Sequence, residues 1–233
     1  MKYNAFLLVL LFALMSFVPN LPKDRNPKSL ASNSISKKVE VVFNSLDANN
    51  FNLPNLESFT KAFEGFSILK EQGKIKNNYL TIIDFSLSSR FNRLWVIDMK
   101  ENKIIFNTLV AHGKNSGEDY ATKFSNENES LKSSLGFFTT GETYNGKHGL
   151  SLKLDGLETG INDHARQRAI VIHGADYVSS SFIKSNNRLG KSHGCPALPV
   201  ELTKKIIQTI KEKSCLFIYF PSKEYLNNSR LVS

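Results

Sequence analysis

Two neighbouring stretches decide the fold: Ala169-Ile170-Val171-Ile172-His173-Gly174 and Lys191-Ser192-His193-Gly194-Cys195-Pro196-Ala197. The first is a short apolar run that is typical of a buried strand, and it ends in a histidine. The second presents a cysteine directly behind a glycine. A thiol is a weak nucleophile at neutral pH until a base takes its proton, and histidine is the side chain best suited to that task. The pattern predicts a strand-borne base, His173, beside a nucleophilic thiol, Cys195.

The residues before the cysteine suggest how the sulfur is presented. Gly194 has no side chain and lets the backbone turn sharply, so that the sulfur lies at the tip of a loop. We expect the backbone N–H groups of His193, Gly194 and Cys195 to point toward an oxyanion formed during attack. Ser192 is expected to hold the loop through its hydroxyl. His193 is either an auxiliary residue of the site or a purely structural one.

The length of the chain and its N-terminal sequence indicate how it is divided into a domain and appended segments. With 233 residues, of which 41% are hydrophobic and 22% charged, the chain has room for one domain with a core and an appended segment. Lys2 precedes an apolar run from Ala5 to Val18, which has the layout of a secretory signal and is shorter than the about 20 residues of a membrane span. We therefore predict a signal peptide over residues 1–20, export to the periplasm or cell envelope, and no membrane span after signal removal. The cleavage site and retention as an anchor are left open.

The net charge of +9 is spread along the chain and forms no arginine-rich run. A basic surface suits nucleic acid, an anionic membrane or an anionic cell-wall polymer, and it also suits plain solvation. Export argues against a nucleic-acid partner. No glycine-rich loop for a dinucleotide or a phosphate is present.

The chain has two cysteines, and we expect them to stay unpaired. Cys215 belongs to Cys215-Leu216-Phe217-Ile218-Tyr219-Phe220, which is typical of a buried strand. A free cysteine often acts as a small core hydrophobe. A disulfide to Cys195 would also disable the proposed nucleophile.

The remaining periodicity predicts a mainly β (α+β) fold with a few short helices and an N-terminal helical extension. A linker and helical segment is expected over 21–76, with a possible helix at 35–46 and a stronger one at 56–72, capped by Asn55 and stopped by Gly73. The catalytic domain is expected over 77–222 and a tail over 223–233. The predicted elements of the domain are strands at 79–85, 93–99, 103–110, 136–140, 150–154, 169–172 and 215–220, a helical turn at 161–167, a helix at 202–211, and loops at 114–133 and 174–190.

Three motifs resemble the murein L,D-transpeptidase catalytic domain family. They are Ser133-Ser134-Leu135-Gly136-Phe137-Phe138, the run from Asp163 through His173 to Tyr177, and Arg188-Leu189-Gly190-Lys191-Ser192-His193-Gly194-Cys195-Pro196-Ala197-Leu198-Pro199. The likeness covers roughly residues 79–220 and is strongest to the branch with Pro-Ala after the cysteine. It implies an L,D-transpeptidase-like β-sandwich or barrel.

The resemblance also implies a reaction. Cys195 attacks the L,D bond of a peptidoglycan tetrapeptide stem, D-alanine leaves, and an amine of a second stem or water resolves the thioester. The products are a 3→3 cross-link or a trimmed stem, and no cofactor or metal is needed. His173 is the base in this scheme, oriented by the backbone carbonyl of Gly174.

Substrate contacts are less well defined by the sequence. Arg188 is a candidate for a substrate carboxylate, because a guanidinium binds a carboxylate through two hydrogen bonds. His112, His148 and Tyr144 lie near glycine-rich turns and are candidates for lining the cleft. Ser192 and Gly194 complete the predicted substrate-binding set.

Three other functions are carried as alternatives. An L,D-carboxypeptidase results if water is the acceptor, and a non-catalytic cell-wall-binding module results if the thiol is inert. A zinc hydrolase would use His173, His193 and Cys195 as ligands, although their spacing matches no usual zinc pattern.

Overall fold

The described part of the chain, residues 37–232 of a computed structural model, is built around one eight-stranded sheet. Its order is β3-β2-β1-β8-β4-β5-β6-β7. The strands are β1 Tyr79–Asp84, β2 Leu94–Asp98, β3 Lys103–Thr108, β4 Gly136–Gly146, β5 Gly149–Gly156, β6 Val171–Gly174, β7 Ala197–Leu198 and β8 Cys215–Tyr219. The pairs β1/β8 and β6/β7 are parallel and the other pairs are antiparallel. The predicted signal peptide lies outside the described residues.

The two ends of the strand order meet, so the sheet curves into a nearly closed barrel. Ala111, which follows β3, forms a bridge with Ala197 of β7, and each backbone N–H of this pair donates to the other residue's carbonyl. The predicted mainly β fold with few helices is confirmed. Because the closing contact involves β7, it also holds the segment that follows Cys195.

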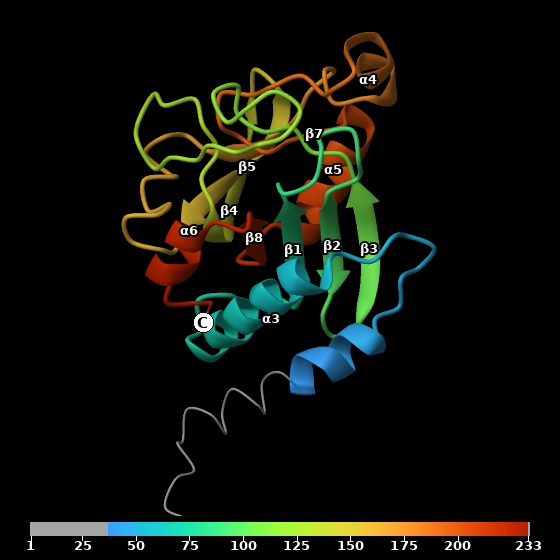
Figure 1. Cartoon of the computed structure of the whole chain (residues 1–233), viewed down its shortest axis with the longest axis vertical. Coiled ribbons are helices and arrows are strands. Elements are labelled where there is room, and N and C mark those ends of the chain that lie inside the picture. Colours follow the sequence, from blue (N-terminus) through green and yellow to red (C-terminus); the bar gives the residue numbers. More distant parts are fainter. Residues whose placement is uncertain (1–36, 233) are drawn as a thin grey trace, which may run out of the picture. The chain divides into compact units, whose positions relative to one another are not determined.

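The helices are short, as predicted, and lie around the sheet (Figure 1). They are a helix over 37–44, α3 Leu56–Glu71, α4 Ser180–Asn186, α5 Val200–Ile210 and α6 Lys223–Asn228. The side chain of Asn55 caps α3 by accepting from the N–H of Glu57, and Gly73 follows its end with a φ of 67°. Gly65 lets α3 approach the sheet closely, since a Cβ there would lie 2.1 Å from the Phe137 ring.

The strand that carries His173 is supported from behind by α5. Ile206, Ile207 and Ile210 form the buried face of this helix, which packs on β6 and β5. Burying each of these side chains contributes on the order of 2 kcal/mol. His173, the predicted base, therefore lies on a buried strand of the core.

Several elements differ from the sequence-based expectations. The predicted helical turn at 161–167 is a run of turns, and β6 begins only at Val171 because Ala169 has a φ of 53°, which interrupts a strand. The loop 174–190 contains the short helix α4. The residues predicted as a tail form α6, whose Tyr225 is buried in the core.

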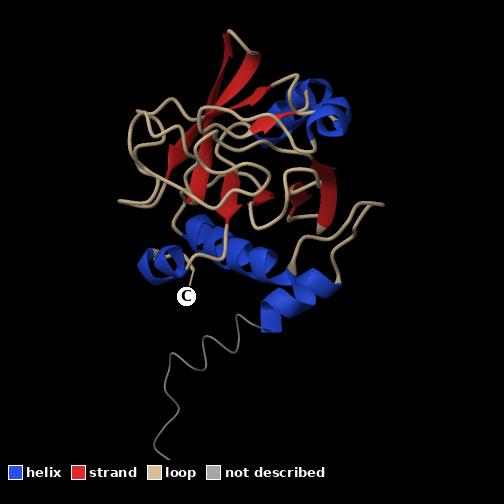
Figure 2. Cartoon of the chain, turned by 45° about the horizontal axis from the view of Figure 1, so that its top comes forward, coloured by secondary structure: helices blue, strands red, loops and turns tan. Residues whose placement is uncertain are grey.

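The largest difference concerns the hairpin of β4 and β5, which continues to Gly146 and Gly149 (Figure 2). Tyr144 and His148 therefore belong to a long hairpin and its tip, where the sequence indicated a turn. None of the helices described in residues 37–232 is both long and apolar enough to cross a membrane.

Candidate active site

Cys195 and His173 lie on neighbouring parallel segments. His173 pairs with Ala197, two residues after Cys195, so the same register sets Cys195 beside Val171. The backbone N–H of Val171 donates to the Sγ of Cys195 over 3.4 Å, which agrees with that register.

The thiol is docked on the backbone that leads into β6. Its Sγ lies 3.6 Å from the carbonyl oxygen of Ala169, to which the thiol donates. Among the described residues, the hydrogen bonds of the sulfur go to Ala169 and Val171, and none goes to the imidazole. Burial raises the pKa of the thiol, while the Val171 N–H and the nearby Arg168 act in the opposite direction.

His173 is held in one orientation by its own strand. Its Nδ1 lies 2.9 Å from the carbonyl oxygen of Gly174, an acceptor that requires the proton to be on Nδ1. The side chain is buried, and this burial lowers the pKa of His173 below 6.5, with His148 and Lys147 adding to the effect. The resting imidazole is therefore neutral, with Nε2 as its proton acceptor.

The loop before Cys195 is stiffened by Ser192. The Ser192 hydroxyl donates to the carbonyl of Cys195 over 2.6 Å and accepts from the N–H of Gly194 over 3.0 Å. Gly194 has a φ of 122°, and a Cβ there would lie 2.8 Å from the carbonyl oxygen of Lys132. The structure thus assigns Ser192 the loop-holding contact that the sequence predicted.

One expected oxyanion donor is not available. The N–H of Gly194 is used by Ser192 inside the loop, so the expectation that it points toward an oxyanion is wrong. Within residues 37–232, the N–H groups of His193 and Cys195 donate no hydrogen bond and are left for that purpose. His193 itself is exposed.

Arg168 is a site residue that the sequence did not suggest. Its guanidinium donates to the carbonyls of Ser125 and Lys132, each over 2.7 Å, and to the hydroxyls of Ser130 and Ser134. It thereby ties the loop over 125–134 to the start of β6 and brings a positive charge near Cys195. An arginine five residues before a histidine is too common to signal such a role.

His112 does not line the cleft, because it is buried behind it. Its Nδ1 lies 2.8 Å from Nη2 of Arg93, and its Nε2 lies 3.2 Å from the carbonyl oxygen of Gly117. Arg93 is itself fully buried and donates to the carbonyls of Val110 and Leu87. The carbonyl of His112 accepts from Ser192, so this buried pair supports the cysteine loop from behind.

The residues predicted to contact substrate lie on two elements, the loop before Cys195 and the β4–β5 hairpin. Arg188 pairs with Glu118 over 3.2 Å and donates to the carbonyl of Leu189, so its guanidinium is already engaged in the loop before the site. Tyr144 is exposed on the β4–β5 hairpin, with the Lys153 ammonium 5.7 Å from its ring centre. His148, at the tip of that hairpin, stacks on His173. The structure brings His148 to the base and leaves Arg188 in an ion pair.

The state of the two cysteines and the arrangement of possible zinc ligands bear on the sequence-based alternatives. Both cysteines are free, as predicted, and Cys215 is buried in β8. In the part of the chain that the structure describes, no three His, Cys, Asp or Glu side chains are arranged to hold a metal ion, and this includes the three residues that a zinc hydrolase would use.

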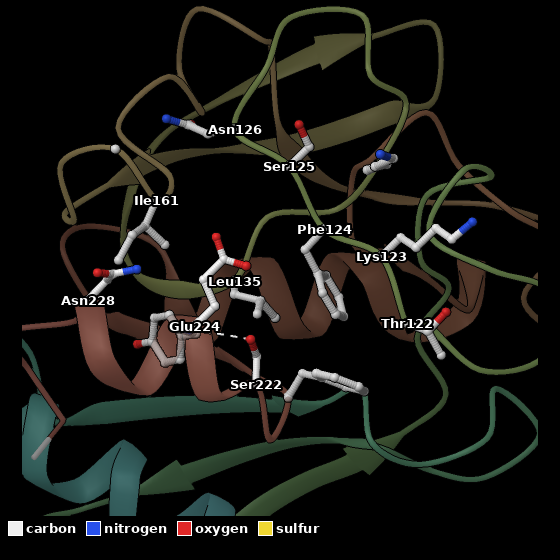
Figure 3. Close-up of a pocket in the computed structure, with 14 residues that line it drawn as sticks. Thr122, Lys123, Phe124, Ser125, Asn126, Leu135, Ile161, Ser222, Glu224 and Asn228 are labelled. Carbon is white, nitrogen blue, oxygen red and sulfur yellow. Dashed lines mark hydrogen bonds between the residues drawn. The ribbon is translucent and has the colours of Figure 1, made fainter.

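A pocket with a volume of about 490 Å³ is lined by neither Cys195 nor His173. It lies between the loop over 122–135 and α6, and the ring of Phe124 points toward Ser222 (Figure 3). Its lining includes Lys132, whose carbonyl contacts Arg168 and the cysteine loop. The pocket thus borders the loop that Arg168 holds.

Comparisons with solved structures give weak likenesses. An L,D-transpeptidase from Mycobacterium smegmatis is 12% identical with a TM-score of 0.39, covering 61% of this chain and 59% of that one. The helical cell shape determining protein of Campylobacter jejuni, solved as a mutant, is 18% identical with a TM-score of 0.41, covering 70% and 55%. This chain spans less than two thirds of the length of either.

Comparisons of sequence are more decisive. Among curated proteins, the DNA-directed RNA polymerase subunit beta of Eimeria tenella is 32% identical over a match of 123 residues, and the match covers 46% of this chain and only 12% of that protein. The family described as L,D-transpeptidase catalytic domain matches residues 52–219, well over half of the chain, including the whole barrel and the site. The chain therefore belongs to the L,D-transpeptidase catalytic domain family.

Proposed function

We propose that this protein is a cysteine-dependent peptidoglycan L,D-transpeptidase that acts on tetrapeptide stems through a thioester at Cys195. The observation that carries the proposal is the register of β6 and β7, which sets Cys195 beside Val171 and two residues short of His173. The Nδ1 contact of His173 with Gly174 supports it, because that contact leaves Nε2 as a base.

Acylation begins with a rotation of the Cys195 side chain away from Ala169 toward His173. Nε2 takes the thiol proton, and the sulfur forms a bond to the carbonyl carbon of the L,D peptide bond. The N–H groups of His193 and Cys195 donate to the resulting oxyanion. The C–N bond then breaks, and the proton on His173 passes to the amine of the departing D-alanine.

Resolution of the thioester runs through the same groups. An amine of a second stem loses its proton to Nε2 of His173 and forms an amide bond as the C–S bond breaks. The proton returns to the sulfur. The product is a 3→3 cross-link, and another amine in place of the stem gives attachment of that acceptor. Water in the same place gives the L,D-carboxypeptidase reaction.

Export to the periplasm or cell envelope belongs to the same proposal. The substrate lies outside the cytoplasmic membrane, and the apolar run after Lys2 offers a route for secretion. The excess of basic residues suits an anionic wall polymer.

The test is incubation of purified disaccharide tetrapeptides with the wild-type protein and with Cys195→Ala, followed by mass spectrometry of the muropeptides. We expect cross-linked dimers with the wild type and none with the variant. The matched control is Cys215→Ala, which removes the other free thiol from the buried strand β8 and should leave the dimers in place.

The outcomes separate the alternatives. Tripeptides without dimers would indicate the carboxypeptidase, and binding to the wall without either product would indicate a non-catalytic module. Covalent labelling of Cys195 by a carbapenem would argue against the latter, because an inert thiol is not acylated. Product formation by Cys195→Ala would overturn the mechanism.

A further inference from the structure

A second imidazole lies directly on the proposed base. The rings of His148 and His173 are 4.5 Å apart between centroids and inclined by 25°, which is a stacked arrangement. His173 is only 4% exposed, whereas His148 is exposed. The ring of His148 therefore covers a face of His173.

The β4–β5 hairpin places His148 at its tip, where the ring contacts His173. Gly146 and Gly149 pair with each other at its end, so Lys147 and His148 are the two residues of its tip. Gly149 has a φ of 73°, a conformation that glycine adopts without strain. The two long strands behind the tip project from the rest of the sheet (Figure 2). The contact is thus made from an element remote in sequence from both Cys195 and His173.

Burial favours the neutral form of His173, and its hydrogen bond to Gly174 acts in the opposite direction. The hairpin contributes His148 and Lys147, and both disfavour a proton on His173. From α5, which packs on β6, Thr203 lies against Gly174, while the charged residues Glu201, Lys204 and Lys205 are exposed. The cysteine loop contributes the thiol of Cys195, and no carboxylate acts on the ring among the described residues.

We propose that His148 is a positioning residue of the reaction: it covers the imidazole of His173 and, when it carries a proton itself, keeps His173 in its neutral, proton-accepting form. This rests on the proposed function of His173 as the base. Two stacked imidazoles at this distance cannot both be charged without strong repulsion. Burial penalises a charge on the ring of His173, so His173 is the imidazole that stays neutral and free to accept a proton from the thiol.

The consequence is a base that works at lower pH than an isolated one. At a ring separation of 4.5 Å, a proton on His148 opposes protonation of His173, so the neutral form of His173 persists to lower pH. Removing the charge at position 148 should raise the pKa of His173.

The test is a titration of the imidazole ¹⁵N signals by NMR in the full chain, for the wild type, His148→Phe and His148→Ala. Phenylalanine keeps a ring over His173 and removes only the charge, whereas alanine also exposes the ring to water. We expect the apparent pKa of His173 to rise by about half a unit in H148F and further in H148A. Asn145→Ala, an exposed substitution on the same hairpin, should leave the titration unchanged.

The kinetic counterpart is the pH profile of Cys195 acylation, whose acid limb should move upward in H148F by the same amount. An unchanged His173 titration in H148F, or a shift to lower pH, would overturn the proposal. The titration needs no substrate, so it separates this inference from the proposed function. Absence of transpeptidation by the wild type would refute the function, and the NMR result would still decide whether His148 controls the charge of His173.

Discussion

The backbone N–H of Val171 donates to the sulfur of Cys195 over 3.4 Å, and the imidazole of His173 belongs to the same strand two residues further on. One strand therefore carries the base and also holds the resting thiol. Because burial raises the pKa of Cys195 and lowers that of His173, the resting pair is a thiol and a neutral imidazole. In the proposed reaction, the thiol proton moves to His173 only after the sulfur leaves Val171 and turns toward the ring.

The first prediction concerns the pH profile of acylation. The active pair needs a neutral His173 and a protonated thiol, and the pKa of the first lies below 6.5 while that of the second lies above 9.0. Activity should therefore rise on an acid limb below 6.5 and fall on an alkaline limb above 9.0. Stopped-flow measurement of acylation across the pH range checks this. An acid limb at or above 6.5 would contradict the neutral resting pair.

The second prediction concerns Arg168, whose charge favours the thiolate of Cys195. Arg168→Met should raise the pKa of the thiol further and slow its alkylation by iodoacetamide about tenfold at a fixed pH near neutrality. Arg168→Lys keeps the positive charge but loses the guanidinium group that holds the loop over 125–134. Its rate of alkylation should lie between that of the wild type and that of Arg168→Met. The control is Arg166→Met, an exposed arginine paired with Asp155 and Glu142, which should alkylate at the wild-type rate.

The third prediction concerns the glycine before the nucleophile. Gly194→Ala places a Cβ against the carbonyl of Lys132 at a φ that other residues rarely adopt, so the loop must shift and move the sulfur. We expect acylation to fall by about a hundredfold, because a displacement of about 1 Å is enough for that. Gly160→Ala also has a positive φ but meets nothing within 4 Å and lies away from the site. If both variants lost activity equally, strain in general and not the position of the sulfur would be the cause.

The sequence was sufficient for the parts of the site that lie on regular elements. The apolar run before His173 predicted its strand, and the periodicity of 56–72 predicted α3 to within a residue, together with its Asn55 cap. These features can be predicted locally, because hydrophobic periodicity and helix caps depend on residues that are close together in the sequence. The contact of His173 with Gly174 was likewise expected, but only through the family resemblance.

The contacts that hold the loops in place could not be predicted from the sequence. Arg168 binds carbonyls and hydroxyls some forty residues away in sequence, and the stack of His148 on His173 depends on how far the β4–β5 hairpin extends. The left-handed conformation of Ala169 shortened a strand that its composition favoured. Each depends on tertiary contacts that no local pattern specifies, and the error over the N–H of Gly194 has the same origin.

The fourth prediction concerns the buried Arg93. Arg93→Met would leave the carbonyls of Val110 and Leu87 and the Nδ1 of His112 without their donor in the core. The free energy of unfolding should fall by about 3 kcal/mol, since each unsatisfied buried group is costly. The same substitution at Arg90, which makes a part-exposed ion pair with Asp119, should cost less than about 1 kcal/mol. Urea unfolding of the two variants measures the difference, and equal losses would mean that the buried contacts contribute little.

The last prediction concerns the pH dependence of stability. Burial and the charge of Arg93 lower the pKa of His112 to about 4, against 6.5 in the unfolded chain. Between these two pKa values, His112 is protonated in the unfolded state and neutral in the folded state. The contribution of His112 to stability is therefore complete above pH 6.5 and is lost as the pH falls toward 4. Between about pH 7 and about pH 5 the free energy of unfolding should fall by about 2 kcal/mol from this group.

His112→Asn offers the check on that figure, because its Oδ1 still accepts from Arg93 but takes up no proton in this range. Urea unfolding of H112N should show a flatter dependence on pH, while His164→Asn, at an exposed position, should keep the wild-type slope. If H112N lost stability on acidification as steeply as the wild type, carboxylates elsewhere would account for the effect. Since His112 supports Ser192 from behind, the same protonation should loosen the cysteine loop and add to the loss of activity at low pH.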